Sequence, residues 1–235
     1  MEHDVVQLDE HADALVLRLA RPPVNAIDLG VVQALAATIE RIAAFPPTRP
    51  LVVTGAGTCF SAGLDLKVVP QYGRHAQRAM LSLVNRLVAD LYGMARPIVA
   101  ALNGHALAAG LVLALACDYR VSTSARCKFG LPEINAGVPY PAAPMLVVRE
   151  ELRPSTARVL VLTGRALTPA EALAMGVVDE VVAPERVVPR GIEMAATLAA
   201  FSAYGRIKAQ FRANGVAALA RIVAENADPM LDRWI

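Results

Sequence analysis

The strongest chemical signal in the chain is a group of small residues just before a stretch that is predicted to form a buried helix. Alanines and a glycine at 106 and 108–110 follow the turn signal Asn103-Gly104, and small residues let another backbone or a ligand approach closely. The run Leu111–Cys117 is apolar on every face, which indicates a buried helix. Because the first N–H groups of a helix have no internal partner and lie at the positive end of its dipole, we expect this place to hold a developing negative charge on oxygen.

The same stretch also has two simpler interpretations. Residues 97–117 carry no Asp, Glu, Lys or Arg, and the run is long enough to span a bilayer. The turn at Asn103-Gly104, together with Pro97 and His105, instead favours a short buried strand at Ile98–Leu102 that leads into the helix. We therefore expect no membrane span. A buried strand and helix without any function remain an open alternative at this point, since packing explains most buried apolar runs.

Composition excludes several other classes of function. A net charge of +2, from 23 basic and 21 acidic residues, gives no basic footprint for nucleic acid. The N-terminus is acidic and polar, unlike a signal peptide, and an odd number of cysteines is typical of free thiols in a reducing cytoplasm. We therefore predict a cytoplasmic protein without a metal site. No metal-ligand spacing links the candidate ligands, which are Cys59, Cys117, Cys127, His3, His11, His75 and His105.

A glycine-rich loop, Gly55–Lys67, follows the predicted buried strand Leu51–Thr54. It imitates the dinucleotide fingerprint G-x-G-x-x-G, but Phe60 occupies the position of the third glycine and no acidic residue lies at the expected offset. An ordinary surface loop is the alternative. Because Leu64 and Leu66 are apolar as well, we expect the loop to pack down onto the rest of the molecule.

Strands and helices alternate in the first part of the chain, and helices dominate the last part. Strands are predicted at Val5–Leu8, Ala14–Ala20, Asp118–Thr123 and Val177–Val182. Helices are predicted at Leu29–Ala44, Arg74–Tyr92, Met145–Leu152, Thr156–Leu162, Pro169–Met175, Pro184–Phe201 and Ala203–Asn226. Asp28 is the predicted N-cap of the first helix, and Thr168 and Glu171 are predicted to form a capping box. A loop is predicted at Ile134–Pro144. We expect an α/β core over residues 1–182 and a helical region over residues 183–235.

Several motifs in register resemble the crotonase (enoyl-CoA hydratase/isomerase) superfamily, over about residues 5–210. They are RPPVNAID at 21–28, FSAGLDLK at 60–67, RPIVAALNGHALAAG at 96–110, ACDYRVSTSARCKFGLPEINAGVPY at 116–140 and LTGRALTPAEALAMGVVDEVV at 162–182. The resemblance implies a crotonase-like spiral of β-β-α units with a helical C-terminal trimerisation region. It also implies an acyl-CoA thioester as substrate, a homotrimer or hexamer, and no cofactor apart from the coenzyme A of the substrate.

The resemblance also assigns roles to individual residues. The backbone N–H groups of Leu64 and Ala109 would form an oxyanion hole for a thioester enolate, a charge that needs such donors near neutral pH. One acid/base glutamate of the family is present as Glu133. The position of the second glutamate is occupied by Val112, which cannot carry a proton, and the position of the aspartate of the dienoyl-CoA isomerases is occupied by Pro141.

One retained carboxylate favours a Δ3-Δ2-enoyl-CoA isomerase, because a single base can remove a proton from C2 and return it at C4. The alternatives are an enoyl-CoA hydratase with an altered site, another enolate chemistry, and a non-catalytic acyl-CoA-binding protein. The remaining predicted substrate contacts are Ala62, Gly63, Asp65, Leu66, Gly110, Val112 and Tyr140. Arg21 and Lys67 are candidates for contacts with coenzyme A.

Overall fold

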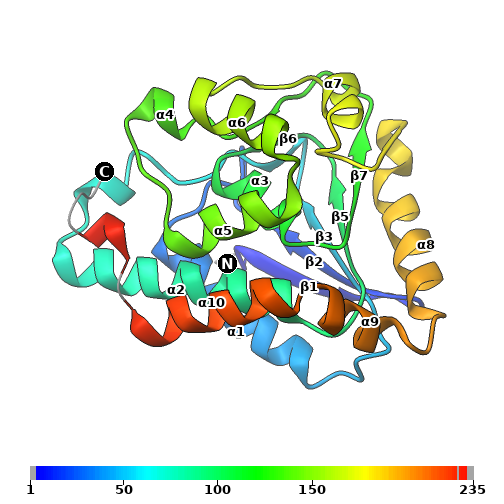
Figure 1. Cartoon of the computed structure of the whole chain (residues 1–235). Helices are drawn as coiled ribbons and strands as arrows, with labels where there is room; N and C mark the ends of the chain where they lie inside the picture. Colours follow the sequence, from blue (N-terminus) through cyan, green and yellow to red (C-terminus); the bar gives the residue numbers. More distant parts are fainter. Residues whose placement is uncertain (1–3, 227, 232–235) are drawn as a thin grey trace.

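A six-stranded sheet runs through the centre of the computed structural model, which describes residues 4–226 and 228–231 (Figure 1). The spatial order of the strands is β1-β2-β3-β5-β7-β9, and only the β1–β2 pair is antiparallel. The strands are β1 (Val6–Glu10), β2 (Leu15–Leu19), β3 (Leu51–Gly55), β5 (Ile98–Leu102), β7 (Tyr119–Thr123) and β9 (Glu180–Val182).

A second, three-stranded parallel sheet explains how the chain advances. It consists of β4 (Cys59–Ser61), β6 (His105–Leu107) and β8 (Phe129–Gly130), and each of these follows a strand of the large sheet. The chain thus repeats a strand in each sheet and then a helix, which confirms the predicted spiral of β-β-α units. Strands of two or three residues are too short to show a periodicity, so the sequence predicted only a loop where β4 lies.

The inner strands β2, β3 and β5 of the large sheet are buried on both faces. Successive side chains of a strand point to opposite faces, and in these strands consecutive residues are apolar. Val16, Val52 and Val99 belong to one core cluster, which packs against α8 (Val187–Ala199). Their neighbours in sequence, such as Leu17 and Val53, belong to the larger cluster on the other face. Figure 1 shows α8 on one side of the sheet and α2, α3, α5 and α10 on the other.

The remaining helices surround these sheets. They are α1 (Leu29–Ala43), α2 (Arg74–Gly93), α3 (Ala109–Leu115), α4 (Glu133–Ala136), α5 (Ala142–Glu151), α6 (Pro154–Thr163), α7 (Pro169–Ala174), α9 (Tyr204–Phe211) and α10 (Ala213–Glu225), with 3-10 turns η1 (Val69–Gln71), η2 (Pro184–Arg186) and η3 (Pro229–Leu231). The predicted N-cap is confirmed, since Asp28 Oδ1 accepts from the Val31 N–H at 2.9 Å. The capping box of Thr168 and Glu171 is confirmed as well.

Several predicted segments differ from the structure. The predicted strand Val177–Val182 forms only at Glu180–Val182, and the predicted helix Pro184–Phe201 begins as the 3-10 turn η2 and continues as α8. The helix predicted at Ala203–Asn226 breaks at Arg212, whose buried guanidinium turns inward to the carbonyls of Tyr92, Ala116 and Cys117. The predicted loop Ile134–Pro144 contains most of α4 and the start of α5. Residues 1–3 with His3, residue 227 and residues 232–235 belong to the predicted regions 1–182 and 183–235 but lie outside the described residues.

No helix in the described ranges is long and apolar enough to cross a membrane. The apolar run 97–117 is divided instead into β5 and α3, as the turn at Asn103-Gly104 predicted, and the short strand β6 between them was not predicted. Helix α3 begins two residues earlier than the apolar pattern indicated, because the small residues Ala109 and Gly110 already belong to it.

Candidate active site

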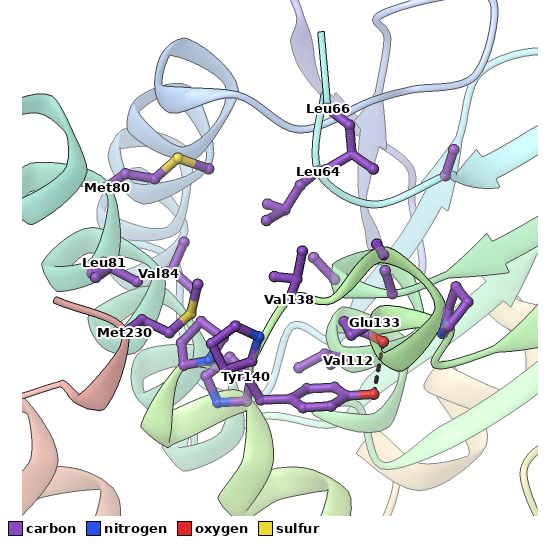
Figure 2. Close-up of a pocket in the computed structure, with 18 residues that line it drawn as sticks. Leu64, Leu66, Met80, Leu81, Val84, Val112, Glu133, Val138, Tyr140 and Met230 are labelled. Atoms are coloured by element: carbon purple, nitrogen blue, oxygen red, sulfur yellow. Dashed lines mark hydrogen bonds between the residues drawn. The ribbon is translucent and has the colours of Figure 1, made fainter. Parts of the chain in front are cut away.

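A largely apolar cavity of about 130 Å³ lies between the loop after β4, the start of α3, the α4–α5 segment and α2 (Figure 2). Its apolar lining includes Ala62, Leu64, Leu66, Met80, Leu81, Val84, Ala108, Ala109, Val112, Val138 and Met230. Glu133 is the only carboxylic acid among the described lining residues. The cavity therefore combines an apolar wall, suited to an acyl chain, with one group that can exchange protons.

The loop after β4 lies directly against the start of α3. Gly63 has φ +86°, and a Cβ at this position would lie 2.6 Å from Ala108 Cβ and 2.9 Å from the Leu107 carbonyl oxygen. A glycine is therefore required at 63 for both conformation and space. The same Cβ position is 3.3 Å from the Ala109 nitrogen, so the backbone that leads into Leu64 is adjacent to the first turn of α3.

Side chains behind the loop hold it in place. The Asn25 amide donates to the Cys59 carbonyl at 2.7 Å and to the Ala56 carbonyl at 3.0 Å. The Ser61 hydroxyl donates to the Asn25 carbonyl at 2.8 Å and accepts from the Gly63 N–H at 3.2 Å. Sequence reasoning did not single out Asn25 or Ser61, although both lie inside the quoted motifs. Asn25 has φ +51°, a conformation that asparagine tolerates in turns.

Helix α3 starts from an unusual backbone conformation at the cavity. Ala108 has φ +50° and ψ −128°, which is rare for a residue with a Cβ and is typical of functional sites when the surrounding structure enforces it. Gly110 lies against Ser61, since a Cβ at 110 would be 2.5 Å from the Ser61 carbonyl oxygen. Among the described residues, the N–H groups of Leu64 and Ala109 have no acceptor. They are available to an oxygen atom of a ligand.

Glu133, the first residue of α4, forms a hydrogen bond inside the cavity (Figure 2). The Tyr140 hydroxyl lies 2.7 Å from Glu133 Oε2 and 3.2 Å from the Leu131 carbonyl oxygen. A phenol has one hydrogen, so we assign it to the shorter contact with the carboxylate. Burial raises the pKa of Glu133, and the hydrogen bond from Tyr140 partly offsets that increase.

The environment of Tyr140 keeps its hydroxyl protonated. Burial, and then the negative charge of Glu133, raises the pKa of Tyr140 well above its ordinary value. Tyr140 is therefore a hydrogen-bond donor to Glu133 and not a base. Val112 lines the same cavity as these two side chains and is 2% exposed (Figure 2), and its apolar side chain cannot carry a proton.

The structure brings most of the predicted site residues together. Seven of them line the cavity, namely Ala62, Leu64, Leu66, Ala109, Val112, Glu133 and Tyr140. Gly63, Asp65 and Gly110 do not line it, and the two glycines lie where the loop and α3 meet.

The two candidate contacts with coenzyme A lie close to Asp65. Arg21 pairs with Asp65 at 2.8 Å and with Asp28 at 3.1 Å. The hydrogen bond from Arg21 is the main cause that lowers the pKa of Asp65. Lys67 has an exposed side chain, and its backbone N–H donates to Asp65 Oδ1 at 3.1 Å.

Sequence reasoning missed one side of the cavity. Met80, Leu81 and Val84 from α2 form part of it, together with Val138 and Met230. Met80 lies among the buried residues of α2, but the apolar pattern of a helix does not reveal whether a given residue meets other protein atoms or a cavity. No local signal marks Met230, which is far away in the sequence.

The described residues contain no cluster of three or more His, Cys, Asp or Glu side chains that could hold a metal ion. The three cysteines are buried and free.

Comparison with known proteins connects this geometry to one family. The family model for enoyl-CoA hydratase/isomerase matches residues 9–231. The probable enoyl-CoA hydratase EchA17 of Mycobacterium tuberculosis is 34% identical over 186 residues, which cover 78% of this chain and 71% of that protein.

Solved structures agree with the sequence match. An enoyl-CoA hydratase/isomerase family protein from Pseudomonas syringae superposes with a TM-score of 0.88 and 26% identity, over 99% of both chains. Human mitochondrial delta3-delta2-enoyl-CoA isomerase superposes with a TM-score of 0.85 and 26% identity, over 95% of this chain and 92% of that one.

Proposed function

Because this chain belongs to the enoyl-CoA hydratase/isomerase family, we propose that it moves the double bond of a 3-enoyl-CoA thioester to the 2-position. The observation that carries this proposal is that the cavity has a glutamate at position 133 and a valine, which cannot carry a proton, at position 112. Among the described residues, the lining of the cavity offers Glu133 as the one carboxylate for proton transfer and holds no second carboxylate to share the work.

In the proposed reaction the thioester oxygen accepts hydrogen bonds from the Leu64 and Ala109 N–H groups. Glu133 removes a proton from C2, and the negative charge spreads over the dienolate with its largest density on that oxygen. Preorganised backbone donors stabilise such a charge better than water does. The protonated Glu133 then returns the same proton at C4. The double bond moves from the 3- to the 2-position, and the enzyme regains its starting state.

This proposal requires one group that acts first as base and then as acid. A carboxylate with a raised pKa suits both tasks, because the two steps demand opposite affinities for the proton. Hydration of a 2-enoyl thioester is different, since a water must be held and deprotonated while C2 is protonated. Two carboxylates share that work well, and Val112 cannot take part. We therefore expect hydration to be slower by about 10²–10⁴-fold than in a site that has both carboxylates, because this is the usual size of one acid/base contribution.

A direct assay separates the candidate functions. The conjugated thioester absorbs in the ultraviolet, so one cuvette holds a 3-enoyl-CoA and another holds a trans-2-enoyl-CoA. We expect the absorbance to rise in the first cuvette and stay constant in the second. A fall in the second cuvette would identify a hydratase instead. Two flat traces with retained acyl-CoA binding would indicate a binding protein or another enolate substrate.

The hydrogen bond from Tyr140 leads to a pH prediction. Tyr140→Phe removes a donor that lowers the pKa of Glu133, so that pKa should rise in the variant. Since Glu133 must be deprotonated to act as a base, the acidic limb of the profile of kcat/KM against pH should move to higher pH. Tyr119→Phe is a matched control, because Tyr119 is a half-buried tyrosine beside Glu180 and outside the cavity. An acidic limb that stays in place would contradict the assigned contact.

A further inference from the structure

A buried carboxylate holds the C-terminal turn η3 onto the body of the molecule. Asp228 Oδ2 accepts from the Asn85 amide at 2.8 Å and from the Ala142 N–H at 2.9 Å, and Oδ1 accepts from the Met230 N–H at 2.9 Å. Asn85 Oδ1 in turn accepts from the Ala143 N–H at 3.0 Å. Asp228 and Asn85 are 6% and 4% exposed. Among the described residues, no Lys or Arg pairs with Asp228.

These four hydrogen bonds, which we call the Asp228 node, join three elements that build one side of the cavity. Helix α2 contributes Asn85 to the node and Met80, Leu81 and Val84 to the lining. The start of α5 contributes two N–H groups to the node and Pro144 to the lining. The turn η3 contributes Met230.

Figure 2 shows Met80, Leu81, Val84 and Met230 together, across the cavity from Glu133. With the thioester at Leu64 and Ala109, the tail of an acyl chain points toward this far side. Met230 is 1% exposed and packs with Leu81 and Val138, so it closes the cavity there.

The size of the cavity sets the length of chain that fits. A cavity of roughly 150 Å³ in another protein holds benzene, a molecule of six carbon atoms. The cavity described above measures about 130 Å³, so it accommodates an acyl group of about six carbons. A longer chain must displace Met230 or the turn that carries it. Methionine is unbranched and flexible, so it blocks a longer acyl chain only while its backbone is held in place. The hydrogen bonds of the Asp228 node hold the backbone of η3 in place.

We propose that Met230, held in place by the Asp228 node, selects short acyl chains of about six carbons by closing the tail end of the cavity. This proposal rests on the proposed function for the identity of the substrate, but it concerns residues that take no part in proton transfer. It makes Met230 a specificity-determining residue and Asp228 and Asn85 positioning residues.

Turnover of two chain lengths tests the proposal. We would measure kcat/KM for 3-hexenoyl-CoA and 3-dodecenoyl-CoA with the wild type, Met230→Ala and the control Met194→Ala. Met194 lies on α8 in the core cluster on the other face of the sheet. Met230→Ala should shift the ratio of the two kcat/KM values toward dodecenoyl-CoA by about 10-fold or more, the size typical of discrimination between chain lengths in apolar pockets. The control should leave the ratio unchanged, and an unchanged ratio in Met230→Ala would overturn the proposal.

Asp228→Asn tests the node separately from the methionine. It keeps the shape but places an amide NH₂ group among three N–H donors, so η3 should loosen and the ratio should shift in the same direction. If this variant does not fold, Met230→Ala still decides the question.

Calorimetric binding of saturated hexanoyl-CoA and dodecanoyl-CoA to the same proteins provides a readout independent of turnover. If the wild type turns over no enoyl-CoA, the proposed function fails. A chain-length shift in binding by Met230→Ala would still support the role of Met230, whereas unchanged binding would contradict it.

Discussion

Glu133→Gln is expected to lower the rate of 3-enoyl-CoA isomerisation by about 10²–10⁴-fold, the range typical of a lost acid/base group. An amide has nearly the shape of the carboxyl group but cannot accept the C2 proton. The Tyr140 hydroxyl, 2.7 Å away in the wild type, can still donate to an amide oxygen, so the local structure should persist. Within residues 4–226 and 228–231, the lining of the cavity holds no other carboxylate that could replace Glu133.

The measurement is single-turnover and steady-state isomerisation of 3-hexenoyl-CoA, together with calorimetric binding of hexanoyl-CoA. Binding should change little while kcat falls, because the loss concerns a proton transfer rather than contact with the acyl chain. Glu40→Gln, an exposed change on α1, serves as the control and should keep full activity. Wild-type activity in Glu133→Gln would mean that another group carries the proton, and the isomerase proposal would have to be abandoned.

The motifs in the sequence predicted the core of this site because its parts are local. The AGLDL loop, the small residues before α3 and the segment with Glu133 each occupy a few consecutive positions, and the predicted spiral brings them together. The same locality predicted Asp28 as an N-cap and the Thr168 capping box, since a cap depends on residues three apart.

The remaining parts of the site depend on contacts between distant residues. Met230 lines the cavity beside Asp228, whose carboxylate accepts from Asn85, 143 positions away in the sequence. The bond between Tyr140 and Glu133 spans only seven residues, but it depends on how the chain folds back after α4, which a loop rich in proline and glycine does not reveal. The sequence motifs indicated both residues as site candidates but did not predict the hydrogen bond between them.

The break between α9 and α10 has the same kind of cause. The apolar periodicity of residues 203–226 continues across Arg212, and neither glycine nor proline marks that position. The chain turns there because the Arg212 guanidinium donates to the carbonyls of Ala116 and Cys117, at 3.3 and 3.2 Å. These carbonyls follow α3, so a cation lies at the end where the helix dipole is negative.

Asp118 is the centre of this arrangement, and its replacement is expected to cause the largest loss of stability. Its carboxylate lies 2.8 Å from Lys208 Nζ and 3.0 Å from Arg212 Nη1, and it accepts from the Ile98 N–H at 2.8 Å. All three side chains of the ion pairs are at most 8% exposed. Asp118→Ala would leave the buried Lys208 ammonium without its carboxylate, whereas Arg212 keeps an ion pair with Glu151 at 3.1 Å. Removing one partner of a buried ion pair costs about 3–5 kcal/mol in the free energy of unfolding.

Urea denaturation of the wild type and Asp118→Ala checks this expectation. Glu193→Ala is the matched control, because it breaks an ion pair with Arg186 in which both side chains are about half exposed. Exposed pairs contribute about 0–1 kcal/mol, so the control should differ little from the wild type. A similar small loss in both variants would show that water or other groups compensate the buried charges.

The pKa of Lys208 predicts how the instability of Asp118→Ala depends on pH. Burial lowers it, and the Asp118 charge opposes that decrease, so removing Asp118 should lower it further. A lysine whose pKa is lower in the folded state than in the unfolded state binds fewer protons when folded. The instability of Asp118→Ala should therefore diminish as pH rises through the folded and then the unfolded pKa of Lys208.

Because α3 carries Ala109 at its other end, loosening this network should also reduce isomerase activity in the protein that remains folded.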